Sequence, residues 1–182
     1  MKNKEDIYKI MTIVFIIDQG IKLSVRKNLV LQKVVTIIPK FFSLCYVENT
    51  GAAFSILKNN TVLLTVFSAV ILAILERTIK KTKTFSKLEI ISYGLLTGGI
   101  LGNMLDRLIY HAVTDYLSFT FFSYQFPIFN FADMAITIGV ILLLIDTFQE
   151  KEKGKEIEEK DLIKNLKLKK ERKSKNESHR KI

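Results

Sequence analysis

The chain alternates between long apolar stretches and short polar connections up to residue 149, and it is densely charged beyond that point. Four apolar stretches lie near 7–25, 61–79, 90–106 and 128–148. Each approaches the roughly 20 residues that a membrane-spanning helix needs. From Thr61 to Leu75 no charged residue occurs on any helical face, whereas a soluble surface helix shows a polar stripe. The pattern predicts an all-α membrane protein with four transmembrane helices. A soluble bundle of long buried helices is the less favoured alternative.

The distribution of lysine and arginine predicts the orientation of these helices. Four spans place both termini on one side of the membrane. Residues 1–9, the 76–89 link and the start of the tail carry more basic residues than the opposite connections, although the first of those is also basic. The positive-inside rule therefore puts both termini in the cytoplasm. The acidic residues at the ends of the apolar stretches then lie toward the outer face: Asp18, Asp106, Asp115 and Asp133.

The two outer connections are predicted to be structured. Residues 34–47 are rich in β-branched and aromatic residues, which predicts a short sheet or hairpin with Pro39 at an edge or turn. Residues 116–126 alternate aromatic and small polar groups, so they form either an interfacial aromatic belt or a lid over a lipid-facing site. Residues 1–149 are predicted as the membrane domain and residues 150–182 as a charged cytoplasmic tail, whose basic part can attract anionic lipid headgroups.

Composition excludes several kinds of site. Cys45 is the only cysteine, and His111 and His179 are the only histidines, without ligand-spaced partners. A metal site built from cysteine or histidine is therefore not expected. No aromatic platform accompanies the basic tail, so nucleic-acid binding is not expected either. No small-residue cleavage site follows the first apolar stretch, which is therefore interpreted as a retained anchor and not as a signal peptide.

The third apolar stretch has a face of small and polar residues. Gly94, Gly98 and Gly102 repeat every fourth residue, and the row continues to Asp106. Such a row lets another helix approach closely, so Gly98, Gly102 and Asp106 are predicted to be structural. Beside this row lie Asn103 and Arg107, which would then point into the bundle. The simpler alternative is that Asp106 and Arg107 only anchor a helix end at the interface, and the Asp18–Lys22 pair has the same alternative.

Asp115 and Asp133 are the strongest candidates for chemistry. Ionisable groups at membrane depth are costly and usually functional. A link of about 20 residues can bring the two together at the outer boundary, where close carboxylates share a proton. Such a pair supplies a general base and a general acid. Asn130 and Asp133 also fit a plain helix N-cap with a carboxylate three residues on.

Five motifs in register resemble the bacterial lipoprotein signal peptidase family, signal peptidase II, over about residues 10–148. They are Asp18-Gln19 with Lys22; the run from Asn49 to Ser55; Gly98-Gly99 with Gly102 to Arg107; Val113-Thr114-Asp115-Tyr116; and Phe126 to Asp133. The departures are Tyr116, where the family more often has phenylalanine, the absence of tryptophan and a longer charged tail.

The resemblance implies a membrane aspartyl protease of the bacterial cytoplasmic membrane, with Asp115 and Asp133 as its catalytic pair. Its substrates would be prolipoproteins that carry diacylglyceryl on the lipobox cysteine, cleaved just before that cysteine. The family needs no metal or cofactor and is inhibited by globomycin, and a monomer is expected. The resemblance assigns substrate binding or support of the pair to Asn49, Asn103, Arg107, Asn130, Asp18 and Lys22. It also places residues 34–47 in a small extracytoplasmic sheet that cradles the substrate.

Two other function classes remain as alternatives. A four-helix protein with polar groups at one end can be a small transporter or proton-relay subunit, or a non-catalytic scaffold. A transporter would carry polar residues onward to the cytoplasmic side. The second stretch and the span from Gly139 to Ile145 offer none, so the protease is favoured.

Overall fold

The computed structural model describes residues 2–51, 57, 59–122 and 124–152. The chain divides into two compact units, residues 1–143 and residues 144–182. The structure describes the second unit only over residues 144–152, which are helical. The elements are, in order, α1 (Lys2–Asn28), β1 (Val34–Ile38), β2 (Phe42–Asn49), α2 (Thr61–Lys81), α3 (Lys87–Tyr110), β3 (Val113–Phe121), β4 (Tyr124–Gln125) and a last helix over Phe131–Glu152. The run from Ala52 to Ser55, which belongs to one of the motifs, and the tail beyond residue 152 lie outside the described residues.

Within the described residues, three helices are long and apolar enough to cross a membrane: α2, α3 and the last helix. The predicted first span falls within α1, whose 27 residues are also sufficient in length. However, α1 carries Asp18 and Lys22 inside its apolar stretch, with Lys9 and Arg26 close to either end. Because of these charges, α1 does not count among the helices that are apolar enough to cross a membrane, so the fourth span remains a prediction.

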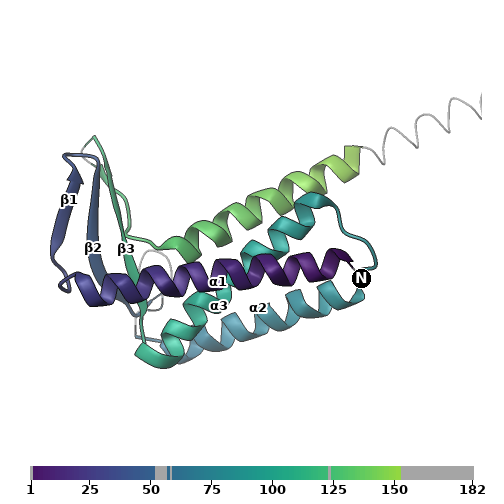
Figure 1. Ribbon diagram of the computed structural model, residues 1–182, viewed down its shortest axis with the longest axis horizontal. Coiled ribbons are helices and arrows are strands. Elements are labelled where there is room, and N and C mark those ends of the chain that lie inside the picture. Colours follow the sequence, from purple (N-terminus) through teal and green to yellow (C-terminus); the bar gives the residue numbers. More distant parts are fainter. Residues whose placement is uncertain (1, 52–56, 58, 123, 153–182) are drawn as a thin grey trace, which may run out of the picture. The chain divides into compact units, whose positions relative to one another are not determined.

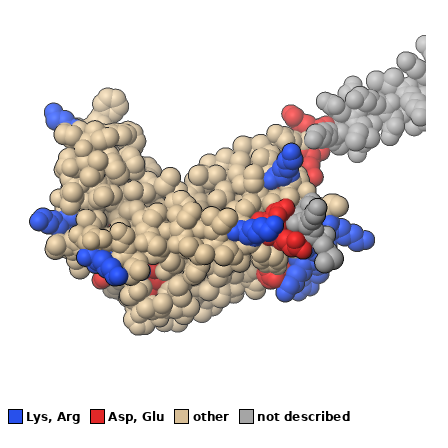
Figure 2. All heavy atoms as spheres, in the orientation of Figure 1, with Lys and Arg blue, Asp and Glu red and all other residues tan. Residues whose placement is uncertain are grey.

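The surface is consistent with a membrane-embedded helical region. On the face shown in Figure 2, charged side chains gather where α1 begins and α2 ends, lysine and arginine side chains lie over the sheet, and the helices between are almost uncharged. Apolar side chains of α2 are strongly exposed, among them Val62, Val66 and Ile74. A protein in water does not present so many contiguous apolar side chains, whereas lipid accepts them.

Glycines set the spacing between α3 and its neighbours. A Cβ atom added to Gly98 would lie 2.7 Å from the carbonyl oxygen of Met11, and one added to Gly102 would meet the carboxylate of Asp18. On the adjoining row, a Cβ at Gly99 would lie 2.7 Å from the carbonyl oxygen of Ala132. The α1 helix and the start of the last helix therefore both approach the backbone of α3 closely. Figure 1 shows α1 crossing α3.

A four-stranded antiparallel sheet, in the order β1-β2-β3-β4, lies at one end of the helices (Figure 1). The predicted hairpin over 34–47 is confirmed as β1 and β2, with Pro39 in the turn between them. The 116–126 segment proves to be mostly β3 and β4, which neither the belt nor the lid interpretation anticipated. Strand β3 pairs with β2, which is distant in the sequence, so no pattern within residues 116–126 predicts this pairing.

Two apolar clusters anchor these elements. Ile7 of α1, Ile79 of α2 and Tyr93 of α3 pack together near the N-terminal end of α1. At its other end Val25 packs with Tyr46 of β2 and Tyr116 of β3, and this second cluster joins the sheet to α1. The α3 helix, which contributes Tyr93 to the first cluster, begins at a capping box formed by Ser86 and Glu89. The sheet is thereby fixed against the helices at the end where the polar side chains of α1 and α3 lie.

We expect Gly98→Ala to lower the free energy of unfolding by about 1–3 kcal/mol, because the backbone atom of Met11 that its methyl group meets cannot rotate away. Gly20→Ala is the matched control, since a Cβ there would have nothing within 4 Å and alanine favours helix. Thermal unfolding in detergent measures both. Equal melting temperatures for the two variants would contradict the close approach of α1 and α3.

Candidate active site

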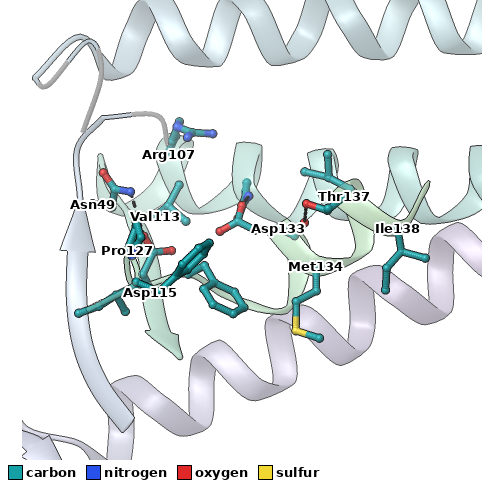
Figure 3. Close-up of a pocket in the computed structure, with 14 residues that line it drawn as sticks. Asn49, Arg107, Val113, Asp115, Pro127, Asp133, Met134, Thr137 and Ile138 are labelled. Atoms are coloured by element: carbon teal, nitrogen blue, oxygen red, sulfur yellow. Dashed lines mark hydrogen bonds between the residues drawn. The ribbon is translucent and has the colours of Figure 1, made fainter. Parts of the chain in front are cut away.

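Asp115 and Asp133 line one cavity of about 550 Å³ at the junction of the sheet and the helices (Figure 3). Asp115 lies on β3, opposite Val47 of β2, and is only 3% exposed. Asp133 lies in the first turn of the last helix. Most of the remaining lining is apolar, contributed largely by the segment from Phe126 to Phe129 and by the helix after it. The structure therefore brings the two acidic side chains to one weakly polar space.

Asn130 connects these two residues. Its amide nitrogen donates to Oδ1 of Asp115 at 2.6 Å, and its amide oxygen accepts the backbone N–H of Asp133 at 3.0 Å. The backbone N–H of Asn130 in turn donates to Oδ2 of Asp133 at 3.2 Å. The predicted helix cap at Asn130 and Asp133 is therefore confirmed. The same asparagine also reaches Asp115, so capping and pairing of the two acids are not exclusive.

Two further asparagines hold the outer oxygens of the pair. Asn49 of β2 donates to Oδ2 of Asp115 at 2.9 Å, while its own oxygen accepts the N–H of Gly51 at 2.9 Å. Asn103 of α3 donates to Oδ1 of Asp133 at 2.7 Å. Each of the four carboxylate oxygens thus accepts one N–H donor, which fixes the orientation of both groups.

Burial raises the pKa of Asp115, and the negative charge of Asp133 raises it in the same direction, so that the pKa lies at about 7. The hydrogen bonds from Asn49 and Asn130 oppose this shift because they stabilise the ionised form. Near neutral pH the two carboxyl groups can therefore hold one proton between them. A carboxyl group that is neutral or charged over this range can both give and accept a proton.

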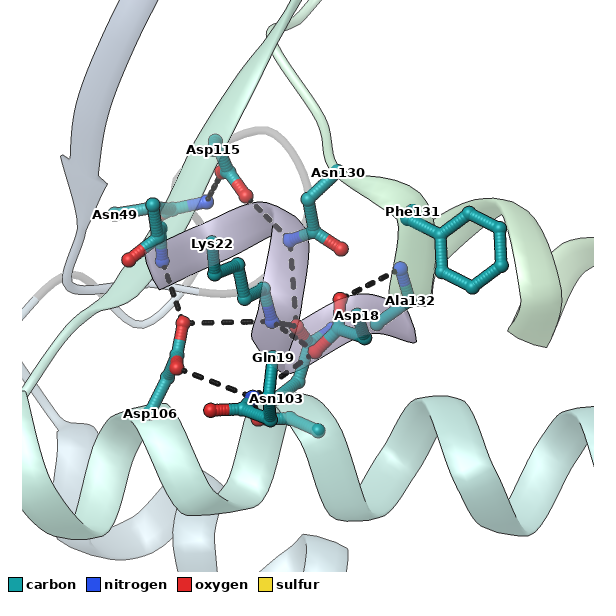
Figure 4. Close-up of polar contacts among 12 residues, drawn as sticks. Asp18, Gln19, Lys22, Asn49, Asn103, Asp106, Asp115, Asn130, Phe131 and Ala132 are labelled. Carbon is teal, nitrogen blue, oxygen red and sulfur yellow. Dashed lines mark hydrogen bonds and ion pairs between the residues drawn. The ribbon is translucent and has the colours of Figure 1, made fainter. Parts of the chain in front are cut away.

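Lys22 of α1 supports the pair through Asn103 of α3 (Figure 4). It is fully buried, and its Nζ lies 2.9 Å from Oδ2 of Asp18 and 3.4 Å from Oδ2 of Asp106. The same nitrogen donates to Oδ1 of Asn103 at 2.8 Å. The lysine therefore orients the asparagine whose other end holds Asp133. Buried ions are tolerated only when paired and hydrogen-bonded in this way.

The two carboxylates that flank Lys22 each hold the backbone next to one of the cavity aspartates. Asp18 accepts the N–H of Ala132 at 3.1 Å, and Ala132 precedes Asp133. Asp106 accepts the N–H of Thr114 at 2.9 Å, and Thr114 precedes Asp115. One buried ion cluster therefore fixes the start of the last helix and the start of β3 together. The interpretation of Asp18 and Asp106 as plain interfacial anchors is wrong, because both are fully buried.

Arg107 lines the same cavity, one helical turn after Asn103. Its Nη2 donates weakly to the carbonyl oxygen of Gly51 at 3.4 Å. Its Nε is buried and has no acceptor within the part of the chain that the structure describes. A charged donor at the cavity is suited to a carbonyl or carboxylate oxygen that enters it. Among the described residues, no three His, Cys, Asp or Glu side chains lie close enough together to hold a metal ion.

Sequence analysis missed Arg26 and the role of Gln19. Arg26 Nη1 donates to Oγ1 of Thr114 at 2.7 Å, and its guanidinium lies 4.2 Å from the ring centre of Tyr110. Gln19 donates to the backbone oxygen of Gly102 at 3.1 Å. The spacing contained a clue to Arg26, because Asp18, Lys22 and Arg26 follow one another every fourth residue.

The chain is similar to known proteins over most of its length. The profile of the family described as "Signal peptidase (SPase) II" matches residues 10–149. The lipoprotein signal peptidase of Maridesulfovibrio salexigens is 34% identical over 147 residues, which cover 78% of this chain and 94% of that one. The lipoprotein signal peptidase of Vibrio campbellii is 38% identical over 149 residues, covering 79% and 88% respectively.

The chain belongs to the signal peptidase II family. A bacterial membrane enzyme solved by the in meso method at 2.3 Å has the same fold, with a TM-score of 0.74 and 31% identity over 80% of this chain and 88% of that chain. A second such structure, at 1.9 Å, gives a TM-score of 0.70 and 32% identity over 78% and 91%. As a signal peptidase II the protein is a protease and a membrane protein.

The raised pKa of Asp115 makes the stability of this signal peptidase II depend on pH. Between 3.8, the ordinary value, and about 7 the folded protein holds a proton that the unfolded chain has lost. Stability therefore falls as pH rises through this window. Asp115→Asn removes that titration. We expect its melting temperature, relative to wild type, to rise steadily between pH of about 4 and about 8.

Thermal unfolding in detergent across this pH range measures the difference. Asp6→Asn, which removes an exposed carboxylate that pairs with Lys9, controls for the simple loss of a charge. A difference between Asp115→Asn and wild type that does not change with pH would show that Asp115 does not carry a raised pKa.

Proposed function

We propose that the protein is an aspartic endopeptidase that removes signal peptides from diacylglyceryl-modified prolipoproteins and cleaves just before the lipid-modified cysteine. The names of its relatives support the substrate class, since they are lipoprotein signal peptidases. The observation that carries the chemistry is the bridge by Asn130, which hydrogen-bonds both to Asp115 and to the backbone of Asp133 in one cavity. Aspartic proteases need two such carboxyl groups that share a proton.

Hydrolysis then follows from one shared proton. The ionised carboxylate takes a proton from a water molecule as the water oxygen bonds to the scissile carbonyl carbon. The protonated carboxyl gives its proton to the carbonyl oxygen, and a tetrahedral diol results. When the diol collapses, the C–N bond breaks and the amine leaves with a proton from the first aspartate, while the diol hydroxyl returns a proton to the second. Asp115 and Asp133 are the two catalytic residues in this proposal.

The surrounding polar residues would bind substrate and support the pair. Arg107, with its buried Nε, is placed to bind a peptide carbonyl of the substrate. Asn49 and Asn103 hold the carboxylates in the orientation that a bound peptide meets. Lys22 and Asp18 act through Asn103 and the backbone of Ala132 and need not touch substrate.

The apolar lining of the cavity suits a lipid-modified substrate. Met134 and Ile138 line the cavity along the last helix and are themselves partly exposed on the helix surface. A diacylglyceryl chain kept in the bilayer would place the scissile bond beside this helix, at the outer membrane boundary. The two acids lie at the end of the helices that the basic residues assign to that side.

The remaining parts of the proposal concern topology. We infer a monomer in the bacterial cytoplasmic membrane with four spans and both termini cytoplasmic, in which α1 crosses as the fourth span. Its length and its exposed Ile13 and Ile16 support this. Residues 1–149 would form the peptidase and residues 150–182 a charged cytoplasmic tail. No cofactor is required, and globomycin is the expected inhibitor.

We expect Asp115→Asn and Asp133→Asn each to lower the cleavage rate by at least about a thousandfold, because either change removes the shared proton or its acceptor. A lipid-modified prolipoprotein peptide, with and without globomycin, is the substrate to use. Asp6→Asn is the matched control, since this carboxylate is exposed and lies outside the cavity. If either Asp115→Asn or Asp133→Asn is folded and cleaves the substrate at a near-normal rate, the aspartic mechanism is wrong.

A further inference from the structure

Thr114 and Tyr116, which flank Asp115 on β3, are both held by contacts on the side of the strand opposite the cavity. Neighbouring side chains on a strand point to opposite faces, so Thr114 and Tyr116 lie on the face away from Asp115. Their exposed fractions are only 2% and 4%, compared with 3% for Asp115. Neither residue lines the cavity. The contacts that Thr114 and Tyr116 make on this face therefore help to set the position of Asp115 relative to Asp133.

Thr114 is held by a cation from α1. Its Oγ1 accepts a hydrogen bond from Nη1 of Arg26 at 2.7 Å, and the same nitrogen lies 3.3 Å from Oδ1 of Asp106. The guanidinium is mostly buried, with a 14% exposed side chain, and it lies over the ring of Tyr110. A planar guanidinium fixed by a ring, a carboxylate and a hydroxyl has little freedom to move.

Tyr116 is held by the helix that carries Asp133. Its hydroxyl oxygen accepts the backbone N–H of Phe131 at 3.2 Å. Phe131 is the first residue of the last helix, where backbone N–H groups have no partner within the helix. The backbone N–H of Tyr116 also donates to the carbonyl oxygen of Phe129 at 3.1 Å. The tyrosine therefore fastens the strand of one acid directly to the helix of the other.

We propose that Arg26 and Tyr116 are positioning residues, which act through Thr114 and Phe131 to hold Asp115 at its working distance from Asp133. The inference rests on the proposed function, because it assigns these residues to the geometry of that same pair. Neither residue contacts the carboxylates of Asp115 and Asp133 in the described structure, and neither lines the cavity. Displacements on the order of 1 Å can cost up to about a hundredfold in rate, so fastenings of this kind bear directly on turnover.

Two nearly isosteric variants test the hydrogen bonds of Tyr116 and Thr114 separately. Tyr116→Phe removes only the hydroxyl that accepts the N–H of Phe131, and the ring stays packed on Val25 and Tyr46. Thr114→Val removes only the acceptor for Arg26, whose ion pair with Asp106 remains. We expect each to lower kcat by about threefold to tenfold, the effect of one lost hydrogen bond, and to leave KM unchanged.

Tyr46→Phe is the matched control. Tyr46 lies in the same apolar cluster and also uses its hydroxyl, but it donates to Glu48 on its own strand at 2.9 Å and to neither acid-bearing element. We expect wild-type kcat from this variant. An equal loss of kcat in Tyr46→Phe and Tyr116→Phe would overturn the proposal, because it would show that any hydroxyl in the cluster has the same effect.

The pH profile separates positioning from a general loss of stability. The charged groups that face Asp115 are Asp133 from the last helix, Lys22 from α1 and Arg107 from α3. If Asp115 shifts away from Asp133, the negative charge of Asp133 acts on it less strongly, and the pKa of Asp115 falls. We expect the alkaline limb of kcat/KM to move to lower pH in Tyr116→Phe and Thr114→Val. An unmoved limb together with wild-type kcat in both would overturn the proposal.

Hydrogen exchange distinguishes failure of this inference from failure of the proposed function. Peptides that cover 113–117 and 130–134 report on the two fastened segments whether or not substrate is cleaved. We expect faster exchange there in Tyr116→Phe than in Tyr46→Phe. Absence of cleavage by wild type would defeat the proposed function, whereas wild-type cleavage with unchanged exchange and kcat in Tyr116→Phe would defeat only the positioning role.

Discussion

The buried ion cluster of Asp18, Lys22 and Asp106 is the constraint on which the rest of the structure depends. Removing such ions from water costs several kcal/mol each unless every group is paired and hydrogen-bonded. All three are fully buried, and the two carboxylates also accept hydrogen bonds from surrounding donors, among them the backbone N–H groups of Ala132 and Thr114. Satisfying the cluster therefore requires α1, α3, β3 and the last helix to meet at one place. The glycines of α3 make that meeting sterically possible.

The site uses this rigidity to hold two acids in an unfavourable position. Burial and mutual charge keep the pKa of Asp115 near 7, so part of the folding stability is given up at neutral pH. Three asparagines offset this by donating to the carboxylate oxygens, and Asn130 does so while also capping the last helix. The arrangement is a local compromise in which stability is lower so that a proton can be shared at neutral pH. In the proposed mechanism, peptide hydrolysis uses this shared proton.

Sequence patterns predicted what is local and missed what is not. The helices, the hairpin over 34–47 and the cap at Asn130 follow from apolar length, β-branched content and cap residues, all within short windows. Strand β3 was missed because its partner, β2, lies more than sixty residues away, and its aromatic residues suggested an interface. Asp18 and Lys22 gave an i,i+4 pair, but only the fold shows that Asp106 completes it. Arg26 was missed because one arginine at a helix end is common at membrane surfaces, and its contact with Thr114 depends on the sheet.

Whether the two carboxylates share one proton is tested most directly by titrating the carboxyl group of Asp115 by infrared spectroscopy in wild type and in Asp133→Asn. In wild type the charge of Asp133 contributes to a midpoint of about 7. Asparagine at position 133 removes that charge and keeps a similar shape, so the midpoint should fall toward the ordinary range of an aspartate. A midpoint that is the same in both proteins would show that the two groups do not interact, and the paired mechanism would be contradicted.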